Sequence, residues 1–423
     1  MAAPHKSVLI LPSLSNPPAP SALSSAYAPT LTSLLPKLLP GNTKASARLD
    51  IGLVLDPSYH TSQPRTQLFS PLESLLRELY SLVCLVAAKQ GIDLDLPGGL
   101  DVRVFFVHPP SDSTNAVPTP LSGPLVDLST LAASLDSATA VYVPGSEAGL
   151  SLATTFSAAF EQVHDTKPRV TVVSHGPSTA ASAGATTTTG AAGTSTTTTH
   201  KAVAVGGTFD HLHIGHKLLL TATLLPASPQ PAHPPRTITV GITDQDLLVN
   251  KKHASVLEPW AQRVERTAAF VESILYFGPA ADVPRIRRID ELHNPGVNGR
   301  ITRYTYTPLP PTTSAALARQ SSDESSVIIN YTLITDPFGP TITDQHITAI
   351  VVSTETRAGG AAVNDKRVDK GWEPLEVFEV GVLDAAGSSN SSSGTAAAAA
   401  FADKISSTQI RQRLVELASE GKL

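Results

Sequence analysis

The sequence predicts an α/β protein with two consecutive parallel-sheet domains. Short apolar runs of strand length alternate with longer amphipathic segments through most of the 423 residues. A stretch of almost pure Ser, Thr, Ala and Gly interrupts this alternation near residue 176, and the alternation resumes after it. Because strands that alternate with helices favour parallel sheets with right-handed crossovers, each half is expected to form such a sheet.

Residues 1–175 are expected to form the first α/β domain. Its predicted strands cover residues 8–11, 51–55, 102–107, 140–143 and 170–173, and its predicted helices cover residues 72–88 and 147–163. The sequence of this half contains no phosphate-binding loop, and its Asp56, His60 and His108 are scattered between elements. The sequence therefore indicates no role for this domain.

Residues 176–200 are predicted to be a flexible linker, because they carry too few large apolar side chains to offset the entropy lost on ordering. The net charge of −5 argues against a general nucleic-acid binder or a basic membrane surface. Cys84 is the only cysteine, which leaves no intramolecular disulfide and no cysteine-based zinc site. No apolar run reaches membrane-spanning length, so a cytoplasmic protein without membrane or nucleic-acid partners is expected.

Residues 201–423 are expected to form a Rossmann-like second domain with a parallel sheet. Its predicted strands cover residues 202–205, 237–242, 327–334, 347–352 and 375–383, and its predicted helices cover residues 214–225, 258–277 and 408–418. Three low-complexity segments, near residues 226–235, 290–326 and 385–400, are expected to be surface insertions.

The strongest chemical motif is Gly-Gly-Thr-Phe-Asp-His-Leu-His-Ile-Gly-His, which begins at Gly206, follows a strand and opens a helix. Gly206 and Gly207 let a phosphate approach the backbone, and the helix start provides N–H groups and a positive dipole end. His213 and His216 can then stabilise charge that grows on a phosphoryl group. A zinc cluster that includes His211, a pair of surface histidines and a chance match are the alternatives.

This motif resembles the signature of the nucleotidyltransferase superfamily, in which Gly-Thr-Phe-Asp precedes His-x-Gly-His. In that family the threonine and both histidines hold the ATP phosphates. The resemblance implies this role for Thr208, His213 and His216, and it places Phe209 and Asp210 in the same ATP-binding loop. The second domain is then a nucleotidyltransferase domain.

A second segment runs from a strand end at Asp244 to the basic pair Lys251 and Lys252. From the residues alone, a solvated lysine pair is the simpler interpretation. The segment resembles eukaryotic and archaeal phosphopantetheine adenylyltransferases, which follow it with Gln-Pro-x-x-x-Arg-x-Glu. Here Glu258 replaces the glutamine. The resemblance implies that Lys251 is the catalytic lysine, with Lys252 as the reserve.

Two further segments resemble the same enzymes. Asp-Pro-Phe-Gly-Pro begins at Asp336 and is interpreted as a turn that shapes the pocket, with Asp336 as a polar anchor for substrate. The other segment, residues 351–360, is Val-Val-Ser-Thr-Glu-Thr-Arg-Ala-Gly-Gly. It lies where a predicted strand ends, and its small polar residues suit contact with a nucleotide. The implied ATP-binding residues in it are Ser353, Thr354, Arg357 and Gly359, and the arginine can pair with phosphate in a bidentate manner.

The last segment is Ile-Ser-Ser-Thr-Gln-Ile-Arg, from residue 405 to Arg411. Ser406 to Gln409 is a capping-box pattern, so helix capping alone explains it. The family's motif matches it residue by residue. The resemblance implies that Ser406, Ser407, Thr408 and Arg411 hold the β- and γ-phosphates.

Together the five segments, which cover roughly residues 200–423, imply a phosphopantetheine adenylyltransferase of coenzyme A biosynthesis. Such an enzyme transfers AMP from ATP to 4′-phosphopantetheine and releases pyrophosphate and dephospho-CoA. Thr208, His213, His216 and Lys251 would be catalytic, and Thr208, Lys251 and Asp336 would contact the acceptor. Mg²⁺ is expected with ATP, and other enzymes of the pathway are expected as partners in a complex.

Other functions remain open from the sequence. A cytidylyltransferase or a nicotinamide mononucleotide adenylyltransferase shares the first and last motifs. A class I aminoacyl-tRNA synthetase has a similar His-x-Gly-His, but the chain lacks Lys-Met-Ser-Lys-Ser, since Met1 is its only methionine. A non-catalytic scaffold is the remaining alternative, chiefly for the first half.

Overall fold

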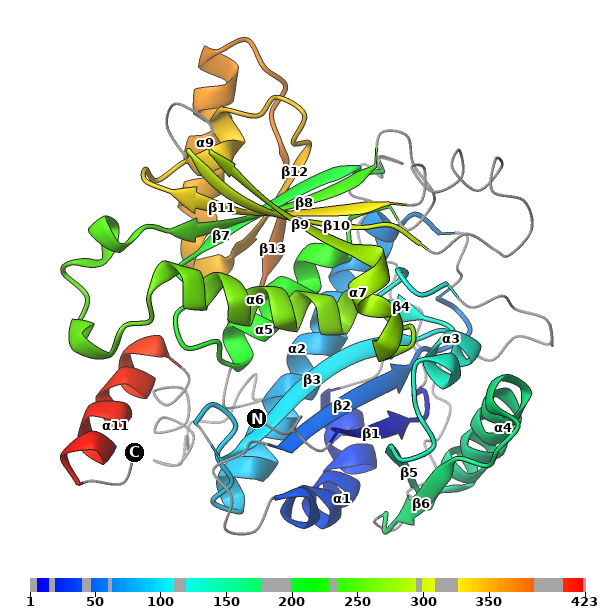
Figure 1. The fold of residues 1–423 in the computed structure, drawn as a ribbon. Coiled ribbons are helices and arrows are strands. Elements are labelled where there is room, and N and C mark those ends of the chain that lie inside the picture. Colours follow the sequence, from blue (N-terminus) through cyan, green and yellow to red (C-terminus); the bar gives the residue numbers. More distant parts are fainter. Residues whose placement is uncertain are drawn as a thin grey trace.

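Two β-sheets organise the chain in a computed structural model (Figure 1). The structure describes residues 6–14, 20–39, 47–59, 63–96, 98–109, 119–175, 199–228, 235–293, 299–308, 326–383 and 406–420. Nearly all of the predicted linker at residues 176–200 lies outside these ranges, as do the predicted insertion at residues 385–400 and most of the one at residues 226–235.

The first sheet has the strand order β4-β3-β2-β1-β5-β6, and its neighbouring strands are all parallel. The strands are β1 (Lys6–Leu11), β2 (Ala47–Val54), β3 (Leu100–Val107), β4 (Leu125–Val126), β5 (Ala140–Pro144) and β6 (Arg169–Val173). The helices are α1 (Pro20–Leu38), α2 (Arg65–Lys89), α3 (Leu128–Ala133) and α4 (Glu147–His164). One face of the sheet packs on α1 and α2, and the other packs on α3 and α4. The five predicted strands and both predicted helices are present.

The sequence did not predict α1, α3 or β4. Helix α1 contains Pro29 and Pro36, which normally mark helix ends because proline lacks a backbone donor. Its buried Leu31, Leu34 and Leu35 nevertheless pack on the sheet, so tertiary packing overrides the local signal.

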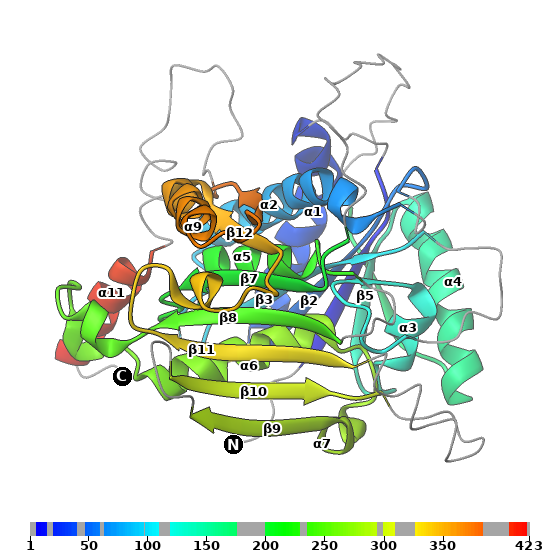
Figure 2. The same ribbon diagram turned by 90° about the horizontal axis from the view of Figure 1, so that it is seen from above.

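The second sheet has the order β13-β12-β7-β8-β11-β10-β9 and is mixed. Its parallel strands are β7 (Ala202–Gly207), β8 (Arg236–Thr243), β11 (Val327–Ile334), β12 (Ala349–Ser353) and β13 (Glu376–Val380). Its antiparallel strands are β9 (Arg287–His293) and β10 (Arg300–Tyr306), which extend one edge of the sheet (Figure 2). The main helices are α5 (Ile214–Leu224), α6 (Trp260–Leu275), α9 (Arg357–Asp369) and α11 (Ser407–Ser419). The α/β fold class with two sheet domains is confirmed.

The β9–β10 hairpin corrects one prediction, because it occupies part of the segment 290–326 that was interpreted as a surface insertion. Its residues are polar, but they pair with β11 from Ile301 opposite Thr332 to Tyr306 opposite Val327. Thr302, Tyr304 and Tyr306 share one face of β10, and the burial of Thr302 and Tyr306 shows that this face is covered. Residues 309–325 lie outside the description.

Strand β7 is the point at which the order of the second sheet reverses. The chain continues from β7 to β8 on one side, whereas β12 joins β7 on the other side. In open α/β sheets, ligands bind at the carboxyl ends of the strands beside such a reversal. The first motif follows β7 directly, so the fold puts it at that position.

The two halves share one hydrophobic core. Helices α2, α5 and α6 lie between the two sheets (Figure 1), and the core continues from Leu76 and Val104 to Leu218 and Val271. Backbone contacts join the halves as well, since the Phe277 N–H donates to the Pro120 carbonyl at 2.6 Å. Among the described residues, no helix has the length and apolar character needed to cross a bilayer.

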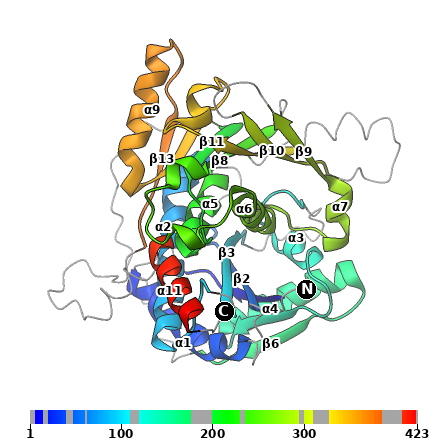
Figure 3. The same ribbon diagram turned by 60° about the vertical axis from the view of Figure 1, so that its left-hand side comes forward.

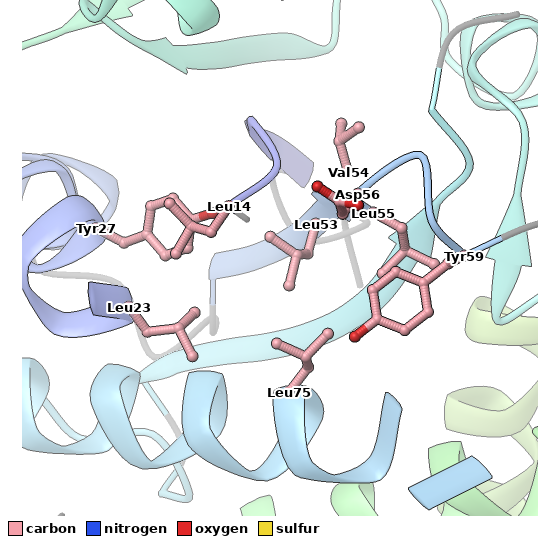
Figure 4. Close-up of a pocket in the computed structure, with 9 residues that line it drawn as sticks. All are labelled: Leu14, Leu23, Tyr27, Leu53, Val54, Leu55, Asp56, Tyr59 and Leu75. Carbon is pink, nitrogen blue, oxygen red and sulfur yellow. The ribbon is translucent and has the colours of Figure 1, made fainter. Parts of the chain in front are cut away.

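The first half contains a small pocket at the carboxyl end of β2, between α1 and α2 (Figure 4). Its lining is mostly apolar, with Tyr27 at one end and Tyr59 at the other. The volume of about 10 Å³ accommodates roughly one water molecule. The pocket is therefore too small for a nucleotide.

Candidate active site

The loop after β7 has an unusual backbone because it must turn sharply into α5. Phe209 and His211 both have positive φ angles, 49° and 46°. The Phe209 side chain is fully buried, and a Cβ atom at Gly207 would lie 3.0 Å from its ring. This close approach explains the glycine at position 207, and the positive φ values are typical of strained functional turns.

His213 is the N-cap residue of α5, and its Nδ1 accepts a hydrogen bond from the Gly215 N–H at 3.1 Å. Because Nδ1 accepts, the proton of the neutral ring lies on Nε2, which is then a donor. Burial holds the pKa of His213 well below its ordinary value, and repulsion from His216 and Lys217 adds to this effect. His213 is therefore neutral at pH 7.

His216 stacks on His213, with 3.8 Å between ring centroids and 26° between ring planes. Burial lowers the pKa of His216 to about 4, although the charge of Asp210 opposes this shift. Its Nδ1 atom is buried and has no hydrogen-bond partner in the described part of the chain. The two imidazoles that the sequence predicted to act together do lie together, as a neutral stacked pair.

The last motif docks on the first. Arg411 and Asp210 form an ion pair of 2.5 Å, and both side chains are almost completely buried. The Ser407 hydroxyl donates to the Asp210 carbonyl at 2.9 Å, and the Arg411 Nε donates to the Lys252 carbonyl at 3.0 Å. The start of α11 therefore lies beside the loop that leads into α5 (Figure 3).

These contacts give Arg411 a different partner from the one expected. Its guanidinium group was predicted to face phosphate, but it binds the Asp210 carboxylate, the Lys252 carbonyl and the Thr408 hydroxyl. Arg411 therefore holds the loop and the helix together. Ser406 caps α11 by accepting from the Gln409 N–H at 3.4 Å, as the capping-box pattern predicted.

Arg263 is a site residue to which the sequence analysis assigned no role. Its side chain is fully buried, and its Nη1 donates to the carbonyls of Thr208 at 2.8 Å and Thr243 at 2.9 Å. Thr208 directly follows β7, and Thr243 is the last residue of β8. Arg263 therefore links the ends of these two strands. The Gln-Pro-x-x-x-Arg-x-Glu resemblance contained this arginine and was the available signal.

Glu258 and His211 complete the framework under the loop. The buried Glu258 carboxylate accepts from the His211 N–H at 2.9 Å and pairs with Arg266 at 2.6 Å. The His211 ring bonds the Val256 carbonyl at 2.7 Å, which turns it towards the backbone. No group of three or more His, Cys, Asp or Glu in the described part of the chain could hold a metal ion. His211, His213 and His216 therefore do not come together as a set of metal ligands in this part of the chain.

Lys251 and Lys252 follow the short helix η1 (Gln245–Leu248), and both are exposed. Neither ammonium group makes a hydrogen bond or an ion pair with any described residue. The Lys252 backbone is tied to α11 through Arg411, as described above. The geometry leaves both lysines free to meet a ligand and does not choose between them.

Asp336 stabilises a tight turn after β11. Its Oδ1 accepts from the N–H groups of Phe338 at 2.7 Å and Gly339 at 2.9 Å. Gly339 has a φ angle of 55°, and a Cβ there would lie 2.6 Å from Ile334 Cγ2. Asp336 therefore shapes the turn. Its Oδ2 is buried and unpartnered within the described structure, so a contact with substrate stays a prediction.

The segment after β12 is more exposed than expected for a nucleotide site. Ser353 Oγ lies 3.1 Å from Thr356 Oγ1, while Thr354 and Gly359 face solvent. Arg357 is paired with Glu379 of β13. A contact between Arg357 and phosphate requires this exposed pair to open, and it stays a prediction.

Comparison with known proteins treats the two halves differently. Residues 1–179 match a family model described as a domain of unknown function, DUF8446. An uncharacterized protein of Schizosaccharomyces pombe is 30% identical over 219 residues, which are 52% of this chain and 50% of that protein. The phosphopantetheine adenylyltransferase of Saccharomyces cerevisiae is 29% identical over 216 residues, which are 51% of this chain and 49% of the enzyme.

The phosphopantetheine adenylyltransferase of Pyrococcus abyssi is 26% identical over 216 residues, 51% of this chain and 92% of the archaeal enzyme. The chain thus spans about half the length of the two fungal relatives and nearly all of the archaeal one. A solved Archaeoglobus fulgidus protein of unknown function aligns with 42% of this chain at 22% identity and a TM-score of 0.25, which carries no weight. Over about half its length, the chain is related to nucleotidyltransferases.

Proposed function

We propose that this protein is a phosphopantetheine adenylyltransferase that converts ATP and 4′-phosphopantetheine to dephospho-CoA and pyrophosphate. One observation carries the proposal. The Asp210–Arg411 ion pair holds the start of α11 beside the loop that leads to the stacked His213–His216 pair. The names of the yeast and archaeal relatives support the choice of substrate. The same proposal includes ATP and phosphopantetheine as the molecules that bind the protein. It also includes a complex with other coenzyme A enzymes and a cytoplasmic location.

The reaction needs no covalent intermediate. The acceptor phosphate is already an anion, so one of its oxygens attacks the α-phosphorus of ATP in line as the bond to pyrophosphate breaks. The protein then has to position the reactants and stabilise charge. Thr208 orients the incoming phosphate, and Lys251 adds a positive charge from the exposed segment after η1.

The histidine pair is suited to the phosphoryl oxygens. The Nε2–H of His213 is a donor because its Nδ1 already accepts from Gly215. His216 is neutral before ATP arrives and gains a proton when triphosphate charge lies beside it, since an opposite charge favours the charged form. The hydroxyls of Ser406 and Thr408, whose oxygens only accept hydrogen bonds among the described residues, hold the leaving pyrophosphate at the start of α11. The Ser407 hydroxyl would have to release the Asp210 carbonyl to join them.

Mg²⁺ fits this arrangement as a companion of ATP. The described residues offer no carboxylate cluster for a resident ion, and Asp210 is already engaged by Arg411. An ion held mostly by phosphate oxygens and water would neutralise part of the triphosphate charge. The residues of the chain then act on the remaining phosphate oxygens.

A substrate panel tests the proposal. The purified chain is incubated with ATP or CTP in combination with 4′-phosphopantetheine or nicotinamide mononucleotide, and the products are separated by mass. We expect product only from ATP with phosphopantetheine. Product with CTP as the nucleotide donor, or with nicotinamide mononucleotide but not phosphopantetheine as the acceptor, would assign the chain to another branch of the nucleotidyltransferases.

A further inference from the structure

The segment between α2 and β3, which belongs to the domain of unknown function, contacts both helices of the candidate site. We call residues 92–96 and 98–101, which include the first two residues of β3, the α2–β3 segment. Its Asp95 Oδ1 accepts a hydrogen bond from the Ile214 N–H, in the first turn of α5, at 3.2 Å. Asp101, at the end of the segment and in β3, pairs with Lys217 of α5 at 2.7 Å. Two carboxylates from the first half therefore hold α5.

The same segment also holds α11. Asp93 accepts two hydrogen bonds from the guanidinium group of Arg413, at 2.9 and 3.0 Å. Leu96 forms a separate small hydrophobic cluster with Ile410 and Leu414 of α11. Leu96 is the only member of this cluster that comes from the first half, and it is 8% exposed.

Helix α11 is thus held by both halves of the protein. Arg411 binds Asp210 in the loop before α5, while Ile410 and Leu414 pack on Leu96 of the first half. A cavity of about 270 Å³ lies between this segment, α11 and the start of α6, and Leu96, Ile410 and Leu414 all line it. Leu96 provides the apolar contact of the segment with α11 in this cluster.

The contact of Asp95 also changes how α5 can bind an anion. Unpaired N–H groups are predicted at the start of α5, but the Ile214 N–H donates to Asp95 and the Gly215 N–H donates to His213. These two hydrogen bonds fix the start of the helix, so these two N–H groups do not point freely at a phosphate. Burial raises the pKa of Asp95, and the Ile214 hydrogen bond and Lys217 oppose this rise.

We propose that the α2–β3 segment is a positioning element for the reaction. It fixes the positions of the starts of α5 and α11 so that the triphosphate can bind between them. The inference rests on the proposed function and assigns a role to the first half. Its basis is that one short segment makes three carboxylate contacts and one apolar contact with these two helices. Productive geometry requires such groups to be held within about 0.5 Å, which loops alone rarely achieve.

The Leu96→Ala variant tests this role. It removes the apolar contact of the segment with α11 and changes no residue that is proposed to bind substrate. Binding of a non-hydrolysable ATP analogue is measured by calorimetry, and amide hydrogen exchange is followed over residues 407–419. If only a minor fraction of the protein keeps α11 seated, the apparent dissociation constant for the analogue rises on the order of tenfold. Exchange in α11 becomes faster, while the KM for the acceptor stays unchanged.

Arg236→Lys is the matched control. Arg236 also joins the halves, since its Nη2 donates to the Leu121 carbonyl at 2.5 Å, but it lies at the amino end of β8, whereas the candidate site lies at the carboxyl ends of the parallel strands. This variant should keep wild-type analogue binding and wild-type α11 exchange even if it melts earlier. Equal weakening of analogue binding in both variants, or unchanged binding and exchange in Leu96→Ala, would overturn the proposal.

A milder variant covers the case in which Leu96→Ala does not fold. Asp93→Asn removes the ion pair with Arg413, whose side chains are both 41% exposed, and should raise α11 exchange with a smaller loss of analogue affinity. Analogue binding and amide exchange in α11 are measured without phosphopantetheine, so failure of the proposed function appears separately as absent transfer to that acceptor. A wild-type protein that does not bind the analogue overturns both proposals.

Discussion

Asp210 and Arg411 form a buried ion pair across 201 positions of sequence, and this pair joins the first and last motifs of the candidate site. Asp210 accepts a second hydrogen bond from the Glu258 N–H at 2.9 Å, so its carboxylate links the β7 loop, the start of α6 and α11. A buried pair of this kind is most sensitive to the removal of one partner, because the other charge is left without compensation.

Replacement of Arg411 by methionine should therefore destabilise the protein by about 3–5 kcal/mol, since Asp210 stays buried without its counter-charge. Urea unfolding measures the loss. The double variant Asp210→Asn/Arg411→Met should recover part of it. If Arg411→Met and Asp210→Asn each lower the free energy of unfolding only slightly, and the two effects add in the double variant, the ion pair does not couple the motifs.

His216→Gln should fold normally and lose roughly 10²- to 10³-fold in kcat, because glutamine cannot become a cation beside the phosphates. Circular dichroism serves as the check on folding, and pyrophosphate release gives the rate. His253→Gln is the matched control, since His253 is an exposed histidine between η1 and η2 (Ala254–Val256). Turnover close to the wild type in His216→Gln would remove His216 from the mechanism.

Binding of MgATP should take up protons near neutral pH. The pKa of His216 is about 4 in the free protein and rises when the triphosphate lies beside it, so between these two values the complex binds more protons than the free protein. The affinity for MgATP should therefore increase as the pH falls from 8 towards 6. Calorimetry in buffers with different ionisation enthalpies measures the uptake. An unchanged uptake in His216→Gln would assign the proton to another group.

The same histidines predict a loss of stability in mild acid. Their pKa values are lowered in the folded state, whereas an unfolded histidine has a pKa of about 6.5. Below pH 6.5 the unfolded chain binds more protons, so the free energy of unfolding falls as the pH drops towards 4, by up to about 1.4 kcal/mol per pH unit for each histidine. Urea unfolding at several pH values measures this slope, which should be flatter in His216→Gln. Equal slopes would show that another group titrates.

Sequence patterns were sufficient for most of the fold because the relevant signals are local. Buried parallel strands are continuous apolar runs, as in β12, and the α6 helix shows regular helical spacing from Trp260 onwards. The first motif is also local, since the strand, turn and helix that contain His213 and His216 are consecutive. The stacked geometry of the two rings follows from their positions at the start of one helix.

The remaining features depend on contacts between distant residues, which no local pattern records. The sequence suggested that Arg411 binds phosphate, yet its partner Asp210 is part of another motif. The contact of Asp95 with Ile214 joins two halves that the sequence presents as separate domains. Helix α1 was missed for a related reason, because its prolines argue locally against a helix that tertiary packing stabilises.

The most direct test of the central claim is product analysis with the purified chain, ATP, Mg²⁺ and 4′-phosphopantetheine, with wild type and His216→Gln side by side. We expect dephospho-CoA and pyrophosphate in equal amounts from the wild type, and only traces from the variant. Absence of dephospho-CoA from a folded wild-type protein, or equal yields from both proteins, would contradict the proposed function.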